Sequence, residues 1–403
     1  MIDWIERHNS ESVFIESADR SSYTFGEIAE AVRSRPEIGA EVIRPSLTVE
    51  SIVDLIAAIS TGSAIVLAPG SPDPGPLDSA GSASVVFTSG TTDRPKGVRL
   101  TKDNWTAAVE ASAGHLGHTG DDVWALAMPL HHVGGLSIVL RSAFVGAMVR
   151  LLPGFDPASF AAALRTGVTL ASVVPTMLSR VLDADSGPYQ GLKAVLVGGG
   201  PIPGGLLERA RHAGLPALPT YGLTETCGQV ATLRPGSNVD YKADPLPGVE
   251  LRVGSEGRIM VRGPMVSPGY VGEPDRAADE WLITGDLGSL DSDGALRVLG
   301  RADEVIVSGG ENVSPSRVEA TLEENSLIRE AMVVGVASEE WGMEVGCLYV
   351  GDILPEEMEA WTRQHLPGFM VPRRWLVVTE IPRTSLGKPD RSVGRSMMEA
   401  ETR

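Results

Sequence analysis

The segment Val86-Phe-Thr-Ser-Gly-Thr-Thr-Asp-Arg-Pro-Lys-Gly-Val carries residue types that could hold a polyphosphate. Its apolar start predicts a strand that leads directly into a loop of hydroxyls, glycine and one lysine. Hydroxyls and exposed backbone amides can surround phosphate oxygens, and Lys96 can neutralise part of their charge. The loop lacks the spacing of a Walker A motif, which disfavours a P-loop kinase or GTPase. Taken alone, the segment could also be a solvated surface loop.

The elements before residue 220 predict a scaffold that would present this loop. Residues 84–88, 170–174, 192–197 and 215–220 are apolar runs that each end in a turn-rich segment, and helical patterns separate them. Uniformly apolar strands of this kind indicate a parallel sheet covered on both faces. Ligands of such sheets bind at the carboxyl ends of the strands, where these polar motifs fall.

The pattern changes from about Gly248 to short alternating runs, which predict antiparallel hairpins closed at residues 256–257 and 293–294. After Arg301 a helix should begin at Pro315, followed by strands and one further helix near residues 355–365. We therefore predict a large layered α/β domain over residues 1–301, with parallel sheets and antiparallel hairpins, and a small mobile α+β domain over residues 302–403.

Composition excludes several classes of protein. The balance of 34 basic against 52 acidic residues gives a formal charge of -18, which disfavours binding to nucleic acid or anionic lipid. The two cysteines, Cys227 and Cys347, argue against a disulfide framework and a cysteine-ligated metal. The acidic N-terminus does not resemble a signal peptide, and Asp54 and Arg141 interrupt the most apolar stretches. A cytoplasmic protein is expected.

Four further segments follow the phosphate-type loop in order: Tyr221-Gly-Leu-Thr-Glu-Thr, Thr284-Gly-Asp, Gly300-Arg-Ala-Asp and Pro382-Arg-Thr-Ser-Leu-Gly-Lys. Together the five resemble the motifs of the adenylate-forming superfamily, which includes acyl-CoA synthetases. The resemblance covers roughly residues 84 to 391. It implies an ATP- and Mg²⁺-dependent enzyme that activates a carboxylic acid as an acyl-adenylate and transfers the acyl group to coenzyme A.

The resemblance also implies roles for single residues. Thr224 and Glu225 would contact the α-phosphate and Mg²⁺, Asp286 would hold the ribose, Asp303 would be the hinge and Lys388 the adenylation lysine. The chemistry itself needs such residues, because a carboxylate that attacks the α-phosphate of ATP is an anion approaching an anion. Each alone has a structural alternative, as a turn residue, a charge at a helix start or a solvated loop tip.

Two glycine-rich segments resemble further parts of the family's site. Gly198-Gly-Gly-Pro would pack against adenine, although such a segment is an ordinary turn in most proteins. Ser308-Gly-Gly would line the tunnel for coenzyme A, because Gly309 and Gly310 leave room for a narrow chain. A simple hairpin is the alternative for this second segment.

The segment Met128-Pro-Leu-His-His-Val-Gly-Gly-Leu resembles the start of the family's acyl-binding helix, with His132 at the acid pocket. Arg141 follows Ser137 by four residues, hence on the same helical face, and could meet a second carboxylate. A structural or solvated charge is the alternative for Arg141, and a buried core residue for His132. This run and the short chain resemble the o-succinylbenzoate CoA ligases of menaquinone biosynthesis. His115 and His118 are expected at the surface.

Two departures from the family pattern matter. Asp93 stands where the family usually has glycine, which adds a negative charge beside the triphosphate, and the sequence before the phosphate loop is abbreviated. Another aryl- or acyl-CoA synthetase, an enzyme that loads a carrier protein, and a nucleotide-binding pseudoenzyme remain alternatives. Oligomeric state is open between monomer and homodimer. The predicted nucleotide site comprises Thr88, Ser89, Gly90, Thr91, Thr92, Lys96, Gly198, Gly199, Gly200, Pro201, Tyr221, Gly222, Thr224, Asp286 and Arg301.

Overall fold

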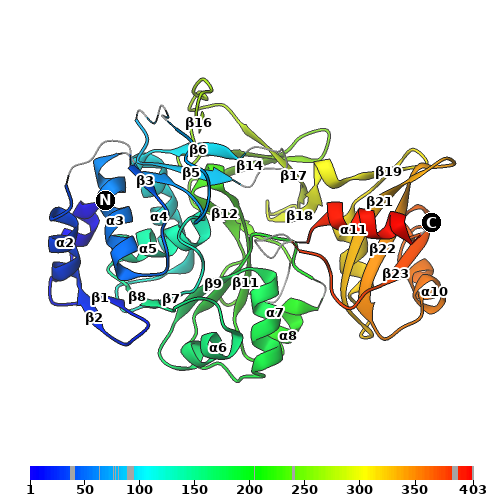
Figure 1. The fold of residues 1–403 in the computed structure, drawn as a ribbon, viewed down its shortest axis with the longest axis horizontal. Coiled ribbons are helices and arrows are strands. Elements are labelled where there is room, and N and C mark those ends of the chain that lie inside the picture. The colour runs from blue at the N-terminus through cyan, green and yellow to red at the C-terminus, as the bar shows by residue number, and fades with distance from the viewer. Residues whose placement is uncertain are drawn as a thin grey trace.

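The structure, a computed structural model, describes residues 1–36, 41–62, 64–75, 77, 79, 81–88, 95–203, 205–237, 241–383 and 389–401. Figure 1 shows a larger N-terminal part and a smaller C-terminal part. A nine-stranded sheet runs through the larger part in the order β13 (Asp244–Pro245), β12 (Gly228–Thr232), β11 (Ala217–Leu223), β10 (Ala194–Val197), β9 (Leu170–Val173), β7 (Val123–Leu126), β8 (Met148–Leu151), β1 (Val13–Glu16) and β2 (Ser22–Thr24). From β11 through β1 every neighbouring pair is parallel. The carboxyl ends of β9, β10 and β11 therefore lie side by side, as predicted.

Two smaller sheets complete the N-terminal part. One has the order β16 (Gly269–Tyr270), β6 (Lys96–Leu100), β5 (Ser84–Thr88), β4 (Ala64–Val66) and β3 (Glu41–Ile43). The strand before the phosphate-type loop thus belongs to this second sheet. The other has the order β14 (Glu250–Val253), β15 (Arg258–Arg262), β17 (Leu282–Leu290) and β18 (Leu296–Arg301). Both predicted hairpins are present in it, and Gly257 and Gly294 turn with φ of 77° and 83°.

Helices cover these sheets: α1 (Ile2–Glu6), α2 (Phe25–Arg33), α3 (Val49–Thr61), α4 (Lys102–Leu116), α5 (Val133–Val145), α6 (Pro157–Arg165), α7 (Pro175–Ala184) and α8 (Leu206–His212). Local sequence sets their ends. Thr101 and Asn104 form a reciprocal capping box at the start of α4, and Gly117 ends this helix with φ of 63°. Helix α5 begins directly after His132, as predicted, and Gly146 ends it with φ of 87°.

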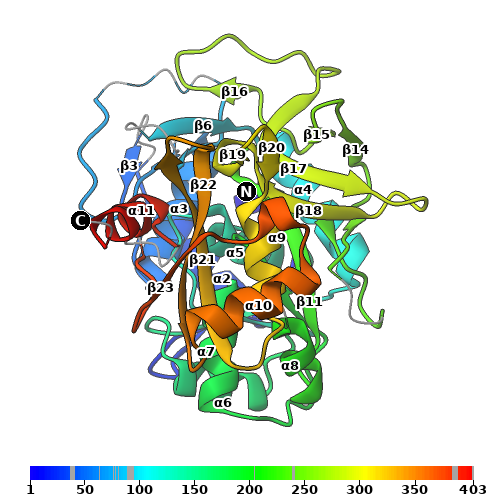
Figure 2. The same ribbon diagram turned by 90° about the vertical axis from the view of Figure 1, so that its right-hand side faces the viewer.

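The C-terminal part begins with the short turn η2 (Ala302–Glu304) and is built on a five-stranded sheet. Its strands are β20 (Glu311–Val313), β19 (Ile306–Ser308), β22 (Gly342–Gly351) and β21 (Ile328–Ser338), with β23 (Arg374–Val377) parallel to β22. Helices α9 (Pro315–Leu322) and α10 (Pro355–His365) pack on one face, against Val333 and Cys347. Helix α11 (Arg391–Ala400) packs on the other, where Met398 joins Met332 and Val334. Figure 2 shows the sheet between α11 and α10.

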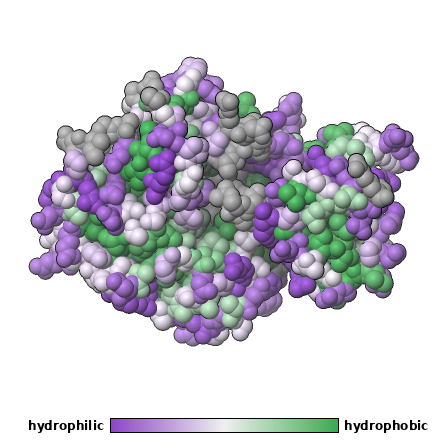
Figure 3. All heavy atoms as spheres, viewed as in Figure 1, coloured by the Kyte–Doolittle hydropathy of each residue, from purple (hydrophilic) through white to green (hydrophobic). Residues whose placement is uncertain are grey.

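Separate hydrophobic clusters fill the two parts. The largest clusters of the N-terminal part use residues up to Leu296, whereas the two clusters of the C-terminal part use buried residues from Ile306 onward. Figure 3 shows hydrophilic residues over much of the surface, with hydrophobic residues among them on both parts. Within the described ranges, no helix combines the length and the apolar character that crossing a bilayer requires.

Candidate functional site

Strand β11 carries Tyr221 to a carboxylate from another sheet. The Tyr221 hydroxyl donates to Asp286 Oδ2 at 2.8 Å, and Arg301 Nη1 lies 3.5 Å from Asp286 Oδ1. Arg301 stands opposite Asp286 in the pairing of β17 with β18. Burial and the nearby Asp286 raise the pKa of the Tyr221 hydroxyl. Tyr221, the first residue of its motif, thus donates to the aspartate predicted to bind ribose.

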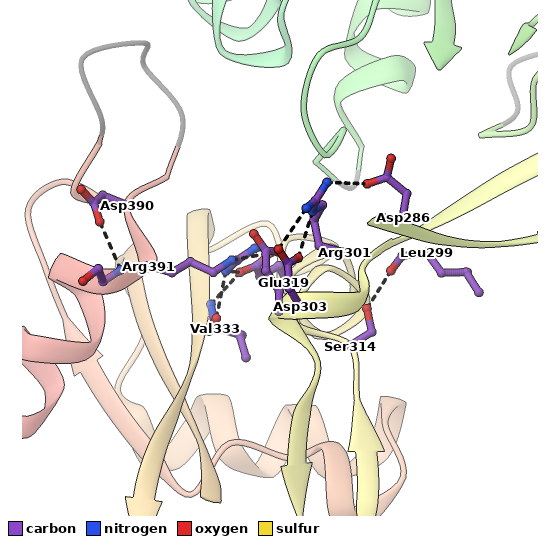
Figure 4. A network of polar contacts seen from close by, with 11 residues as sticks. Asp286, Leu299, Arg301, Asp303, Ser314, Glu319, Val333, Asp390 and Arg391 are labelled. Atoms are coloured by element: carbon purple, nitrogen blue, oxygen red, sulfur yellow. Dashed lines mark hydrogen bonds and ion pairs between the residues drawn. The ribbon is translucent and has the colours of Figure 1, made fainter. Parts of the chain in front are cut away.

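Arg301 also joins this aspartate to the predicted hinge. Its guanidinium donates to both carboxylate oxygens of Asp303, at 3.0 and 2.9 Å, and this hydrogen bonding raises the pKa of Arg301. Figure 4 shows Arg301 between Asp286 and Asp303. The same view shows Arg391 beside Glu319, with Arg391 Nη2 at 3.0 Å from Glu319 Oε2.

Glycines are required where β10 and β11 end. A Cβ atom on Gly198 would lie 2.6 Å from the carbonyl oxygen of Thr220, so the strand ends approach too closely for a side chain. Gly199 has φ of 78°, in the left-handed region. At Gly222 a Cβ atom would lie 1.7 Å from the carbonyl oxygen of Gly228. These glycines leave bare backbone at the edge where parallel sheets bind ligands.

The short turn η1 (Thr224–Thr226) follows β11 and carries Glu225. Glu225 Oε1 accepts a hydrogen bond of 2.8 Å from Tyr270, and the Glu225 carbonyl accepts one of 2.7 Å from the Ser267 amide. Lys96 Nζ lies 4.9 Å from the centroid of the Tyr270 ring. Because no other hydrogen bond to the Glu225 carboxylate exists among the described residues, Oε2 is available as a ligand. A carboxylate oxygen combined with substrate phosphates is a donor set that suits Mg²⁺.

The predicted acyl helix starts tightly packed. A Cβ atom on Gly135 would lie 2.3 Å from the carbonyl oxygen of Pro129, and one on Gly134 would lie 2.7 Å from Met128 Cε. Two glycines therefore allow α5 to follow the preceding turn directly. His132 precedes the first turn, and its ring lies 4.3 Å from that of His131. Burial lowers the pKa of His131.

Arg141 is buried, with 4% of its surface exposed, which contradicts its interpretation as a solvated charge. Its guanidinium lies 5.6 Å from the centroid of the Trp124 ring, and no ion pair to Arg141 exists within the part of the chain that the structure describes. Burial lowers the pKa of Arg141 to about 9. A Cβ atom on Gly228 would lie 3.8 Å from Arg141 Nη2 and 4.0 Å from Ser137 Oγ. Ser137 and Arg141 therefore face the strand that follows η1.

His118 corrects another expectation. It is not a surface residue but is 5% exposed, and its ring meets that of Trp124 edge to face at 5.7 Å. Burial, helped by the positive charge of Arg141, lowers the pKa of His118 to about 4. His115 is half-buried, and burial lowers its pKa as well. The spacing of the two histidines could not predict the burial of His118, because that burial involves Trp124 on β7 and Arg141 on α5.

The two glycines of the predicted tunnel segment, in the C-terminal part, have different surroundings. A Cβ atom on Gly309 would lie 2.6 Å from Trp341 Cε3, so the Trp341 ring fills the space above Gly309. Gly310 has no atom within 4 Å of such a Cβ, and Ser308 is buried. In this arrangement the Trp341 ring therefore lies against Gly309, whereas the space beside Gly310 is open, and the assignment of both glycines to the coenzyme A tunnel stays a prediction.

Several predicted residues lie outside the described ones: Ser89, Gly90, Thr91, Thr92, Asp93 and Lys388. Thr88 and Lys96 flank the loop and stand opposite each other in the pairing of β5 with β6. Three residues near the site were not predicted, namely Tyr270, Trp124 and Trp341. The Ser-Pro-Gly-Tyr turn that ends in Tyr270 is the one local signal that could have drawn attention to it.

Comparison with known proteins decides the family. Residues 13–271 match the AMP-binding enzyme family, and residues 317–388 match the AMP-binding enzyme C-terminal domain. This chain belongs to the AMP-binding enzyme family. The fold class predicted from the sequence and the resemblance to the adenylate-forming superfamily are confirmed.

Single relatives with named activities narrow the comparison within the AMP-binding enzymes. The 2-succinylbenzoate--CoA ligase of Bacillus mycoides (strain KBAB4) is 38% identical over 337 residues, which cover 78% of this chain and 70% of that one. The o-succinylbenzoate CoA synthetase (MenE) of Bacillus subtilis in complex with the acyl-adenylate intermediate OSB-AMP superposes with a TM-score of 0.85 at 27% identity, covering 97% of this chain and 96% of that one. ATP-bound MatB of Rhodopseudomonas palustris shares the fold, with a TM-score of 0.89 at 22% identity, and all of each chain is covered.

Proposed function

We propose that this AMP-binding enzyme is an ATP-dependent acid-thiol ligase that converts o-succinylbenzoate to its acyl-adenylate and then to the coenzyme A thioester. Relatives named for this reaction and the MenE complex with OSB-AMP support the proposal. The MenE complex with ATP and magnesium ion supports ATP as the co-substrate and Mg²⁺ as the cofactor. ATP, Mg²⁺ and coenzyme A suit a site that offers Glu225 Oε2 beside the carboxyl ends of β10 and β11.

The observation that supports this choice of acid is the buried guanidinium of Arg141, which has no ion pair with any residue that the structure describes. Taking a cation out of water without a counter-charge costs several kcal/mol, and folded proteins rarely retain that cost without a use. The guanidinium faces Gly228, two residues beyond the η1 turn that carries Thr224 and Glu225. A dicarboxylic acid could place one carboxylate at the nucleotide and the other at Arg141, which would supply the missing counter-charge.

The first half-reaction joins two anions, so the chain's own residues must lower that repulsion. Thr224 and Lys96 can donate to phosphoryl oxygens, and Glu225 would hold Mg²⁺, which supplies further positive charge when bound. Asp286, with Tyr221 and Arg301 bonded to it, would fix the ribose. Lys388 would bring its charge from the C-terminal part. His132 would lie at the acid, beside Ser137.

We further propose that residues 1–301 and 302–403 are separate domains that alternate between two arrangements about Asp303. The first would serve adenylation, and the second would bring Gly310 to the path of the thiol. One site could then serve two transition states. The separate hydrophobic clusters and the short η2 turn between them support this division.

The proposal is tested by pyrophosphate release with a panel of acids. We expect release with o-succinylbenzoate well above that with benzoate, 4-phenylbutyrate or palmitate. Comparable release with the monocarboxylic acids and none with o-succinylbenzoate would overturn the substrate, and no release with any acid would overturn the ligase.

A further inference from the structure

The carboxylate of Glu225 has a single side-chain partner among the described residues, the hydroxyl of Tyr270. The Tyr270 oxygen lies 2.8 Å from Glu225 Oε1. The Tyr270 hydroxyl is the donor, because an ionised carboxylate can only accept. This bond engages Oε1, whereas Oε2 has no hydrogen-bond partner among the described residues.

The backbone of residues 267–270 fixes this hydroxyl in place. Strand β16 pairs with β6, with Tyr270 opposite Val98 and Gly269 opposite Arg99. The Ser267 amide donates to the Glu225 carbonyl at 2.7 Å, and the Ser267 hydroxyl accepts from the Gly269 amide at 3.0 Å. The backbone of Glu225 and the side chain of Glu225 are therefore both bound to the short segment 267–270. Rotation of the Glu225 side chain would have to break the Tyr270 bond.

The face of the same ring holds Lys96. Lys96 Nζ lies 4.9 Å from the centroid of the Tyr270 ring and 4.0 Å from Glu273 Oε1. Both Lys96 and Glu273 are about half exposed, at 51% and 52% of their side-chain surface, so their ion pair contributes little. Lys96 can therefore leave Glu273 for a phosphate while the ring still limits where its ammonium lies.

We propose that Tyr270 is a positioning residue for adenylation, which aligns Glu225 to ligate Mg²⁺ through one oxygen and keeps Lys96 beside the same phosphates. This rests on the proposed function, in which Glu225 and Lys96 meet MgATP. Residues that orient a metal ligand by hydrogen bonding typically contribute tenfold or more to metal affinity. Tyr270 thus links the strand after the phosphate-type loop to the η1 turn.

The test compares Tyr270→Phe with wild type by calorimetric binding of a non-hydrolysable ATP analogue, with Mg²⁺ and with EDTA. We expect the variant to bind the Mg²⁺ complex about tenfold more weakly and to bind the metal-free analogue as wild type does. In a Glu225→Gln background the same substitution should change the affinity little, because the oriented carboxylate is already lost. For Tyr270→Phe alone, the rate of thioester formation from supplied acyl-adenylate should equal that of wild type, because this step does not use MgATP.

Tyr189→Phe is the matched control. The Tyr189 hydroxyl donates to the Asp185 carbonyl at 3.0 Å, and the Arg165 guanidinium lies 5.6 Å from the Tyr189 ring. The Tyr189→Phe variant therefore loses an equivalent hydrogen bond away from the proposed site. Equal weakening of Tyr270→Phe with and without metal, or affinities that match those of Tyr189→Phe, would overturn the inference. Wild type that binds MgATP but releases no pyrophosphate with any acid would overturn the proposed function instead.

Discussion

Replacement of Arg141 by methionine tests whether this arginine binds substrate or only stabilises the fold. Burial lowers its pKa from 12.5 to about 9, which at pH 7 corresponds to a folding cost on the order of 5 kcal/mol, because the charged form is the one penalised. Methionine keeps most of the apolar contacts but gives up the contact with Trp124, worth about 1 kcal/mol. We expect Arg141→Met to raise the free energy of unfolding without substrate by about 1–3 kcal/mol.

The same substitution should lower catalytic efficiency although it raises stability. Losing a charge-assisted bond to a distal carboxylate costs about 1.5–3 kcal/mol, hence a loss of roughly 10- to 150-fold in kcat/KM for o-succinylbenzoate, mostly through KM. Monocarboxylic benzoates should be nearly unaffected, since they never reach Arg141. Coupled pyrophosphate release over a range of each acid measures both parameters.

Arg150→Met provides the control and the contrast. Arg150 is 9% exposed and its Nε lies 2.7 Å from Glu16 Oε1. Removing it breaks this charge-assisted bond and leaves Glu16 paired with Arg20 alone, which should lower the free energy of unfolding by about 1.5–3 kcal/mol. If Arg141→Met lowers stability as Arg150→Met does and reduces kcat/KM equally for all acids, Arg141 is structural and the reasoning fails.

Three further substitutions and one pH dependence follow from the site. Lys388→Ala should abolish acyl-adenylate formation but spare conversion of supplied acyl-adenylate to thioester, and equal loss in both half-reactions would contradict its role. Asp303→Pro should leave adenylation and reduce thioester formation, because proline fixes φ where rotation needs backbone freedom; if both half-reactions survive, the hinge lies elsewhere. Asp93→Gly should raise adenylation or tighten ATP binding, and a clear loss of activity would refute the idea that the charge is merely tolerated. Because the pKa of His118 falls to about 4 on folding, the unfolded chain binds the extra proton, and stability should drop by up to about 3 kcal/mol between pH 6.5 and pH 4; urea unfolding of His118→Phe should lack this slope.

The sequence predicted the parts of the fold that local patterns encode. The hairpins at Gly257 and Gly294 and the helices that begin at Pro315 and Pro355 follow from turn and cap residues, and the structure has them. The gathering of motifs after β10 and β11 follows from parallel pairing, which brings strand ends to one edge.

What the sequence could not predict depends on contacts between distant segments. Tyr270 reaches Glu225 only because β16 pairs with β6, an antiparallel contact across more than half of the N-terminal part that no periodicity encodes. Trp341 covers Gly309 because the β21–β22 hairpin folds back beside β19. His118 and Arg141 likewise both pack against Trp124, which β7 brings between them from elsewhere in the chain. The sequence around such residues shows no distinctive pattern, and their contact partners come from segments that only the tertiary fold brings close.

The most direct test of the central claim is to supply the purified protein with o-succinylbenzoate, ATP, Mg²⁺ and coenzyme A, and to follow products by mass spectrometry. The account predicts the coenzyme A thioester and AMP with all components, and the acyl-adenylate with pyrophosphate when coenzyme A is omitted. Thioester formation that needs no ATP, or ADP and phosphate in place of AMP and pyrophosphate, would contradict it.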